Sequence, residues 1–112
     1  MSSENRRAKR RQVSQTVEVG DMMAEATVAR IANLSPGGML VIASVPMIDD
    51  ALYQFRFNLS GPDGRERAID VGAHQLWSDA GSATGQSWAG FRFIDISARD
   101  AEFLQGWVEA PG

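Results

Sequence analysis

The chain contains 112 residues, of which 44% are hydrophobic and 22% are charged. This length is typical of one domain, and this hydrophobic fraction is sufficient for a buried core. Because the chain has no cysteine and only one histidine, disulfides, cysteine metal sites and histidine-based metal clusters are excluded. No apolar run reaches the length of a membrane span, and no signal-peptide-like segment follows the basic N-terminus. We therefore expect a cytoplasmic protein that binds no metal and does not associate with a membrane.

The net charge of −3 hides an uneven distribution. Residues 1–11 hold five of the 11 Lys and Arg side chains and one acidic side chain, which leaves 6 basic and 13 acidic side chains, or −7, in the rest. Such an acidic body would repel a long polyphosphate, which argues against DNA or RNA as a partner. A basic arm on an acidic body suits a small anionic ligand, and a solvated basic tail has the same composition.

Apolar periodicity predicts about six β-strands. The first begins around Val13, Val17 and Val19 and breaks at Gly20-Asp21. The others are expected at residues 24–34, 38–44, 52–59, 65–79 and 86–96. Most connections are short and hairpin-like, as at the sequence Gly-Pro-Asp-Gly of residues 61–64, so the sheet should be antiparallel.

The period changes after the last strand. Ser97 is the expected helix N-cap, with Asp100 as its capping-box partner. The side chains that follow at helical spacing form one apolar stripe: Phe103, Leu104, Trp107 and Val108. The predicted fold is therefore mainly all-β, a six-stranded antiparallel barrel that closes to hide its edges and carries a C-terminal α-helix.

The three tryptophans have different expected environments. Trp107 lies on the helix stripe, and Trp77 shares the parity of the apolar face of its strand, so both are expected in the core. Trp88 has the opposite parity from the phenylalanines of its strand, which indicates an exposed side chain. Gly72 indicates a bulge or bend, and Gly90 indicates a close approach of another group.

Enzyme chemistry has little support in the sequence. His74 lies in a strand, and Asp49 and Asp50 lie in an expected loop. Ser35 is not part of a nucleophile elbow, and no Lys-Ser/Thr pair follows Gly37-Gly38 as a P-loop requires. We expect no enzymatic activity.

The turn formed by residues 33–38, Asn-Leu-Ser-Pro-Gly-Gly, carries more polar chemistry than a plain turn needs. Pro36 fixes φ near the value of the second turn position. Gly37 and Gly38 allow positive φ and expose backbone N–H groups. Asn33 and Ser35 add hydrogen-bonding side chains, although an ordinary turn also uses such residues.

The basic arm complements this turn. Arginine pairs with phosphate through two parallel hydrogen bonds, with the O6/N7 edge of guanine, and with aromatic faces. A ligand that carries phosphates and guanines would use all these modes. The expected binding residues of the arm and the turn are Arg6, Arg7, Arg10, Arg11, Asn33, Ser35, Gly37 and Gly38.

Together these motifs resemble the PilZ domain family, bacterial receptors for cyclic di-GMP. The family pattern is Arg-x-x-x-Arg, a first strand, and then [Asp/Asn]-x-Ser-x-x-Gly. Here the arm at residues 6–10 reads Arg-Arg-Ala-Lys-Arg, and the turn reads as given above. The stretch 88–95, Trp-Ala-Gly-Phe-Arg-Phe-Ile-Asp, resembles the C-terminal end of the family. The resemblance covers essentially the whole chain and divides it into a flexible basic arm, 1–12, and a barrel with its helix, 13–112.

The resemblance implies the barrel and helix described above and binding of cyclic di-GMP, often as an intercalated dimer. It carries over Arg6 and Arg10 from the arm, and Asn33, Ser35 and Gly38 from the turn. Arg7 and Arg11 satisfy the same spacing, and we prefer the Arg6/Arg10 register because of its distance from the first strand. Many members have Asp where this chain has Asn33, and both residues fit the pattern.

The leading hypothesis is a single-domain cyclic di-GMP receptor without a further cofactor. Binding would order the arm and alter a surface that a downstream protein effector reads. The alternative is a ligand-independent PilZ-like adaptor that acts through protein contacts. Such adaptors usually lack the arm or the turn, and this chain has both.

Overall fold

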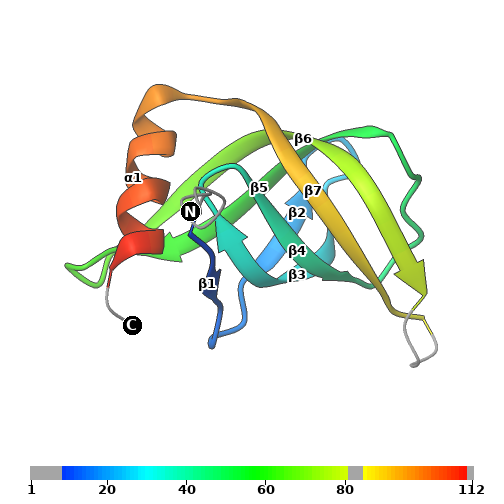
Figure 1. Cartoon of the computed structure of the whole chain (residues 1–112), viewed down its shortest axis with the longest axis horizontal. Helices are drawn as coiled ribbons and strands as arrows, with labels where there is room; N and C mark the ends of the chain where they lie inside the picture. Colours follow the sequence, from blue (N-terminus) through cyan, green and yellow to red (C-terminus); the bar gives the residue numbers. More distant parts are fainter. Residues whose placement is uncertain (1–8, 81–84, 111–112) are drawn as a thin grey trace, which may run out of the picture.

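The computed structural model describes residues 9–80 and 85–110, which form a β-barrel with a helix at one end (Figure 1). The elements in chain order are β1 (Arg11–Gln12), β2 (Glu18–Asp21), β3 (Ala26–Ser35), β4 (Gly38–Ala43), β5 (Leu52–Ser60), β6 (Glu66–Ala80), β7 (Ser87–Ile96) and α1 (Ala98–Glu109). The strands pair in the order β1-β3-β2-β5-β6-β7-β4, and a β3–β4 pairing closes the sheet. Every pairing is antiparallel. The predicted six-stranded barrel, β2 to β7, and the C-terminal helix are confirmed, and β1 is an extra strand.

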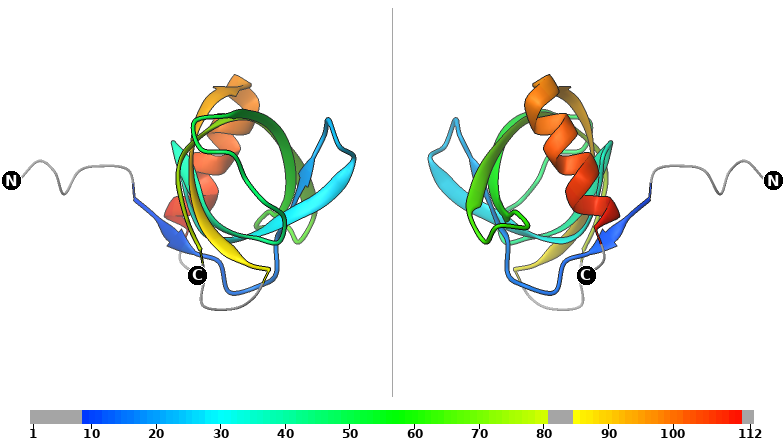
Figure 2. Two further views of the ribbon diagram at one scale, coloured as in Figure 1. Left: turned by 90° about the vertical axis from the view of Figure 1, so that its right-hand side faces the viewer. Right: turned by 90° about the vertical axis from the view of Figure 1, so that its left-hand side faces the viewer.

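The barrel interior is filled by apolar side chains, which alternate along each strand with side chains that face outward. In β5, Phe55, Phe57 and Leu59 are buried, while the residues between them are exposed. The rings of Phe55 and Phe91 meet edge to face with centroids 5.1 Å apart, which joins β5 to β7 across the interior. Helix α1 lies across one end of the barrel, as Figure 2 shows, and buries Leu104 and Val108 against it.

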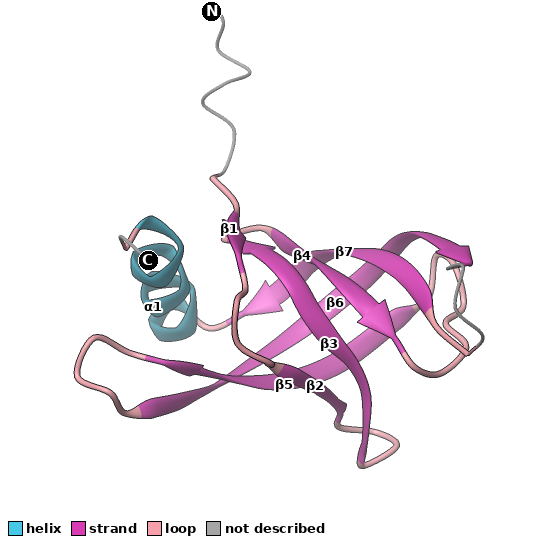
Figure 3. Ribbon diagram, turned by 90° about the horizontal axis from the view of Figure 1, so that it is seen from below, coloured by secondary structure: helices cyan, strands magenta, loops and turns pink. Residues whose placement is uncertain are grey.

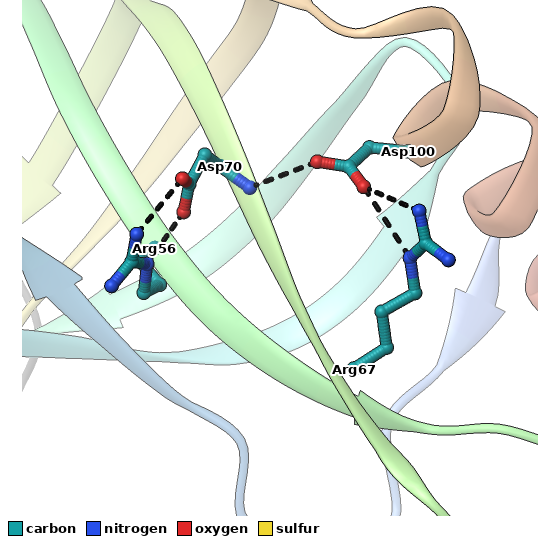
Figure 4. A network of polar contacts seen from close by, with 4 residues as sticks. All are labelled: Arg56, Arg67, Asp70 and Asp100. Atoms are coloured by element: carbon teal, nitrogen blue, oxygen red, sulfur yellow. Dashed lines mark hydrogen bonds and ion pairs between the residues drawn. The ribbon is translucent and has the colours of Figure 1, made fainter.

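The N-terminal end of α1 is fixed to the barrel by polar contacts (Figure 4). Ser97 caps the helix, as expected, and accepts a hydrogen bond from the Asp100 backbone N–H at 3.1 Å. The Asp100 carboxylate accepts from Arg67 Nη2 at 2.9 Å and from the Asp70 backbone N–H at 3.4 Å. Asp70 in turn pairs with Arg56 at 2.6 Å. Hydrogen bonding from Arg56, assisted by its charge and opposed by partial desolvation, lowers the pKa of the Asp70 carboxyl.

Two features of the strands differ from the sequence-based prediction. The strand expected to begin near Val13 begins at Glu18 instead; Val13 and Val17 precede it and pack against the core from outside a strand. The prediction that Trp77 is a core residue is wrong, because its side chain is 44% exposed. Gln75 still follows the buried parity of Ile69, Val71 and Ala73, but a bulge in the β6–β7 pairing between Gln75 and Trp77 shifts the parity after it, so Trp77 faces outward.

The other aromatic and glycine predictions agree with the structure, with one qualification. Trp88 is 39% exposed, as its parity indicated. The pairing of β6 with β7 is also irregular at Gly72, where a bulge was expected. Trp107 packs against the core from a half-buried position rather than from within it. Gly90 lies under the indole of Trp77, which a Cβ on Gly90 would overlap, so the expected close approach is made by a side chain of β6.

Candidate ligand-binding site

Strand β1 brings the end of the basic arm beside the turn between β3 and β4. It pairs antiparallel with β3, with Arg11 opposite Leu34 and Gln12 opposite Asn33. Figure 3 shows β1 alongside β3 at the end of the barrel that carries α1. This pairing places Arg10, the residue just before β1, next to the polar side chains of the turn.

Three of the predicted site residues lie in direct contact. Arg10 Nε donates to Asn33 Oδ1 at 2.7 Å, and Arg10 Nη1 donates to Ser35 Oγ at 3.2 Å. Ser35 is only 2% exposed, and its hydroxyl donates to the carbonyl of Gly38 at 3.2 Å. The guanidinium is therefore held at the turn, and it keeps N–H groups beyond these two contacts for an incoming acceptor.

The two glycines of the turn have different roles from those the sequence suggested. Neither has a positive φ; among the described glycines only Gly64 and Gly85 do. A Cβ on Gly38 would overlap the carbonyl oxygen of Phe91, so Gly38 permits the close pairing of β4 with β7. A Cβ on Gly37 would meet nothing within 4 Å. Gly38 thus supports the site by packing, and Gly37 leaves its rim open.

Arg11 lies on the other side of β1. Its Nη1 donates to the carbonyl of Trp107 at 2.7 Å, and its guanidinium stands 4.0 Å from the centroid of the Trp107 ring. Consecutive residues of an extended chain point to opposite sides, so Arg10 and Arg11 cannot serve the same site in this conformation. Arg11 instead compensates the negative end of α1, which has no basic residue in its last turn. Arg6 and Arg7 lie outside the described residues.

A shallow depression of about 350 Å³ continues from Arg10 and Asn33 over the outer face of the barrel. The strand register explains its lining, because Asn33 lies opposite Leu40, Leu40 opposite Gly90, and Gly90 opposite Trp77. The exposed indole of Trp77 and the side chain of Leu40 form an apolar surface beside a fixed guanidinium. Sequence reasoning missed both residues: the bulge before Trp77 reverses its parity, and Leu40 stands in a continuous apolar run that suggested a fully buried strand. Gly90 was the one available signal, since it marked a place where another group approaches the strand.

The charge of Arg10 is not neutralised by its neighbours. Its two side-chain partners are an amide and a hydroxyl, both uncharged. In contrast, Arg56, Arg65 and Arg67 each lie within 4 Å of an aspartate. Within residues 9–80 and 85–110, Arg10 has no ion pair. An uncompensated cation with fixed geometry is a favourable site for a phosphate or the acceptor edge of a guanine.

Asp49, Asp50 and the histidine, which the sequence offered as candidates for chemistry, form local contacts instead. Asp49 accepts hydrogen bonds from Gln75 and Ser78, both at 2.7 Å, and Asp50 lies 2.6 Å from His74 Nε2. In the part of the chain that the structure describes, no three His, Cys, Asp or Glu residues are placed to hold a metal ion. The described helix is also too short and too polar to cross a membrane.

Comparison with known proteins identifies the family. A sequence model of the PilZ domain matches residues 4–110. The chain belongs to the PilZ domain family. No curated protein matches the sequence.

Solved structures share the PilZ fold at low sequence identity. The Bacillus subtilis inhibitor of motility MotI/DgrA is 15% identical with a TM-score of 0.75; the match covers 91% of this chain and 48% of that protein. The PilZ domain of YcgR from Escherichia coli, determined with c-di-GMP, is 18% identical with a TM-score of 0.63, and covers 91% and 87%. The PilZ domain of CeSA from a cellulose-synthesizing bacterium is 19% identical with a TM-score of 0.59, and covers 88% and 93%. The chain thus spans about half of the length of MotI/DgrA and most of the two isolated PilZ domains.

Proposed function

We propose that this protein is a cytoplasmic receptor for the bacterial second messenger cyclic di-GMP and that it catalyses no reaction. The observation that carries the proposal is the contact of Arg10 with Asn33 and Ser35. The basic arm and the polar turn, 23 and 25 residues apart in sequence, meet at one place in the fold. Membership of the PilZ family and the c-di-GMP complex of the YcgR domain support the same ligand.

The chemistry of the site fits a guanine dinucleotide. Arg10 offers a planar guanidinium to a guanine edge or a phosphate, and Asn33 and Ser35 hold that guanidinium in place. The indole of Trp77 offers a face on which a base can stack. Arg6 and Arg7 of the arm are proposed to complete the grip on the ligand, and Gly37 leaves room at the rim.

Binding is proposed to act on the arm. The part of the arm before Arg10 would close over the ligand on the barrel formed by residues 13–112, since Arg10, Arg11 and Gln12 already lie against the barrel. Several charge-assisted contacts are needed to offset the entropy lost by ordering such a segment. The surface made by the closed arm and the ligand would then be read by a protein effector.

The decisive experiment is isothermal titration calorimetry of the full chain with cyclic di-GMP. The wild type should bind, and Arg10→Ala should weaken binding by at least about tenfold, equivalent to about 1.4 kcal/mol. Amide chemical shifts recorded during the titration should change at Asn33, Ser35 and residues 1–11. A wild-type protein that does not bind cyclic di-GMP would contradict the proposed receptor function. A protein partner captured without nucleotide would then favour the alternative, a ligand-independent adaptor.

A further inference from the structure

A second arginine lies on the same outer face of the barrel as the depression. The register places Ser35 opposite Gly38, and Gly38 opposite Arg92 of β7. This row runs directly beside the row that contains Asn33, Leu40, Gly90 and Trp77. Arg92 is therefore two residues along β7 from the glycine that Trp77 covers.

The side chain of Arg92 faces outward. Along β7, Ala89 and Phe91 are buried in the core, so the residues between and after them point to the opposite side of the sheet. Gly90 on that side is covered by the exposed indole of Trp77. Arg92 shares this side and is itself exposed.

Two further features leave Arg92 available. Its neighbour across the β4–β7 pairing is Gly38, so no side chain stands between Arg92 and the Ser35 hydroxyl, two strand spacings or about 10 Å away. Its neighbour across the β6–β7 pairing is His74, whose ring engages the Asp50 carboxylate. Among the described residues Arg92, like Arg10, forms no ion pair.

We propose that Arg92 is a ligand-binding residue that takes one phosphate of the dinucleotide. This inference rests on the proposed function and adds to it a residue from β7, outside both the arm and the turn. A cyclic dinucleotide carries its two phosphates on opposite sides of one ring. Arg10 approaches the outer face from the start of β1, beside β3, and Arg92 approaches it from β7. A ligand lying over Gly38 and the Trp77 depression would meet one cation on each side.

The test is calorimetric titration of the full chain with cyclic di-GMP in the wild type and four variants. Arg92→Ala should weaken binding by about tenfold, the loss expected for one charge-assisted contact. Arg92→Lys should restore most of the affinity, because an ammonium still pairs with phosphate. Arg99→Ala is the matched control, because it removes an exposed arginine of α1 and should leave the affinity within twofold. Arg10→Ala reports on the proposed function.

The outcomes separate the two proposals. Wild-type affinity in Arg92→Ala, together with weakened binding in Arg10→Ala, would overturn the role of Arg92 and leave the receptor intact. An equal loss in Arg99→Ala would also overturn it, because the effect would then be one of net charge alone. No binding by the wild type would remove both proposals. Circular dichroism and thermal melts of each variant should match the wild type, since Arg92 lies outside the core.

Discussion

Arg10 and Arg11 are neighbours in sequence but belong to different regions of the molecule. Arg10 reaches the turn, where an amide and a hydroxyl hold its guanidinium at an open face. Arg11 reaches the end of α1, where a carbonyl and an indole ring hold it half-buried. The same type of side chain thus serves two purposes, because the extended chain at the start of β1 points these two neighbouring residues to opposite sides.

The difference teaches how the protein distributes its positive charge. Near α1 and on the adjoining strands, arginines form ion pairs with aspartates, as in the Arg67–Asp100 and Arg56–Asp70 pairs. At the turn, the partners of Arg10 among residues 9–80 and 85–110 are neutral, so within this part of the chain its charge is positioned without an ion pair. Asn33 is important here, because an aspartate at that position would pair with Arg10.

The turn depends first on Gly38. Gly38→Ala should lower the free energy of unfolding by about 3 kcal/mol, because the added methyl group overlaps backbone of β7 that cannot move aside cheaply. Chemical denaturation would measure this loss. Gly37→Ala is the matched control and should change the stability by less than about 1 kcal/mol, since its φ is negative and the space is open. Equal effects of the two changes would mean that the β4–β7 contact at Gly38 is not as close as described.

The coupling between Arg10 and Asn33 can be tested by a double-mutant cycle on cyclic di-GMP affinity. Because the two side chains touch, Asn33→Ala should weaken binding chiefly by releasing Arg10. In the Arg10→Ala background the same change should cost less by about 1 kcal/mol. Titration calorimetry of the four proteins would measure this coupling. Strict additivity would show that Asn33 contacts the ligand independently and does not position the arginine.

Arg11→Ala should affect the other region. Loss of the contacts with Trp107 should lower the free energy of unfolding by about 1 kcal/mol, from a hydrogen bond to the helix end and a cation–π contact. Affinity for cyclic di-GMP should stay within threefold of the wild type. Thermal melts and calorimetry on the same samples would check both. A loss of affinity as large as that of Arg10→Ala would place Arg11 in the site and favour the Arg7/Arg11 register.

The sequence predicted the parts of this molecule that follow local rules. The alternation of apolar and polar residues predicted β5, and the capping pair Ser97 and Asp100 predicted the start of α1. The hairpin signals predicted the antiparallel barrel. The turn motif indicated Asn33 and Ser35 as partners of the arm, and Arg10 contacts both in the structure. These features depend on spacing alone, which the sequence contains.

What the sequence did not predict depends on contacts between distant strands. The exposure of Trp77 follows from a bulge in the β6–β7 pairing, and parity counting fails at a bulge because one residue is added to one strand only. The alignment of Arg92 with Gly38 and Ser35 follows from register across three strands. Position 38 requires a glycine because β7 approaches it closely, and not because its φ is positive.

The smallest expected effect concerns the Arg56–Asp70 pair, which represents the compensated arginines. The folded-state pKa of Asp70 lies below its ordinary value of 3.8, because Arg56 hydrogen-bonds to the carboxylate and attracts it. The pair therefore contributes stability that is fully present well above pH 3.8 and is lost as the pH falls through the lowered pKa. Since both side chains are substantially exposed, this contribution is small.

Asp70→Asn should therefore unfold at a slightly lower temperature than the wild type at pH 7, and the difference should shrink as the pH approaches 3. Asp79→Asn, which removes an exposed carboxylate that has no arginine partner among residues 9–80 and 85–110, is the control and should show no such convergence. Thermal melts across this pH range would measure both. Affinity for cyclic di-GMP at pH 7 should be unchanged in Asp70→Asn, because Arg56 lies in the barrel wall and is not part of the proposed site. If the affinity rose instead, the released Arg56 would be acting on the ligand, and the division between compensated and available arginines would not hold.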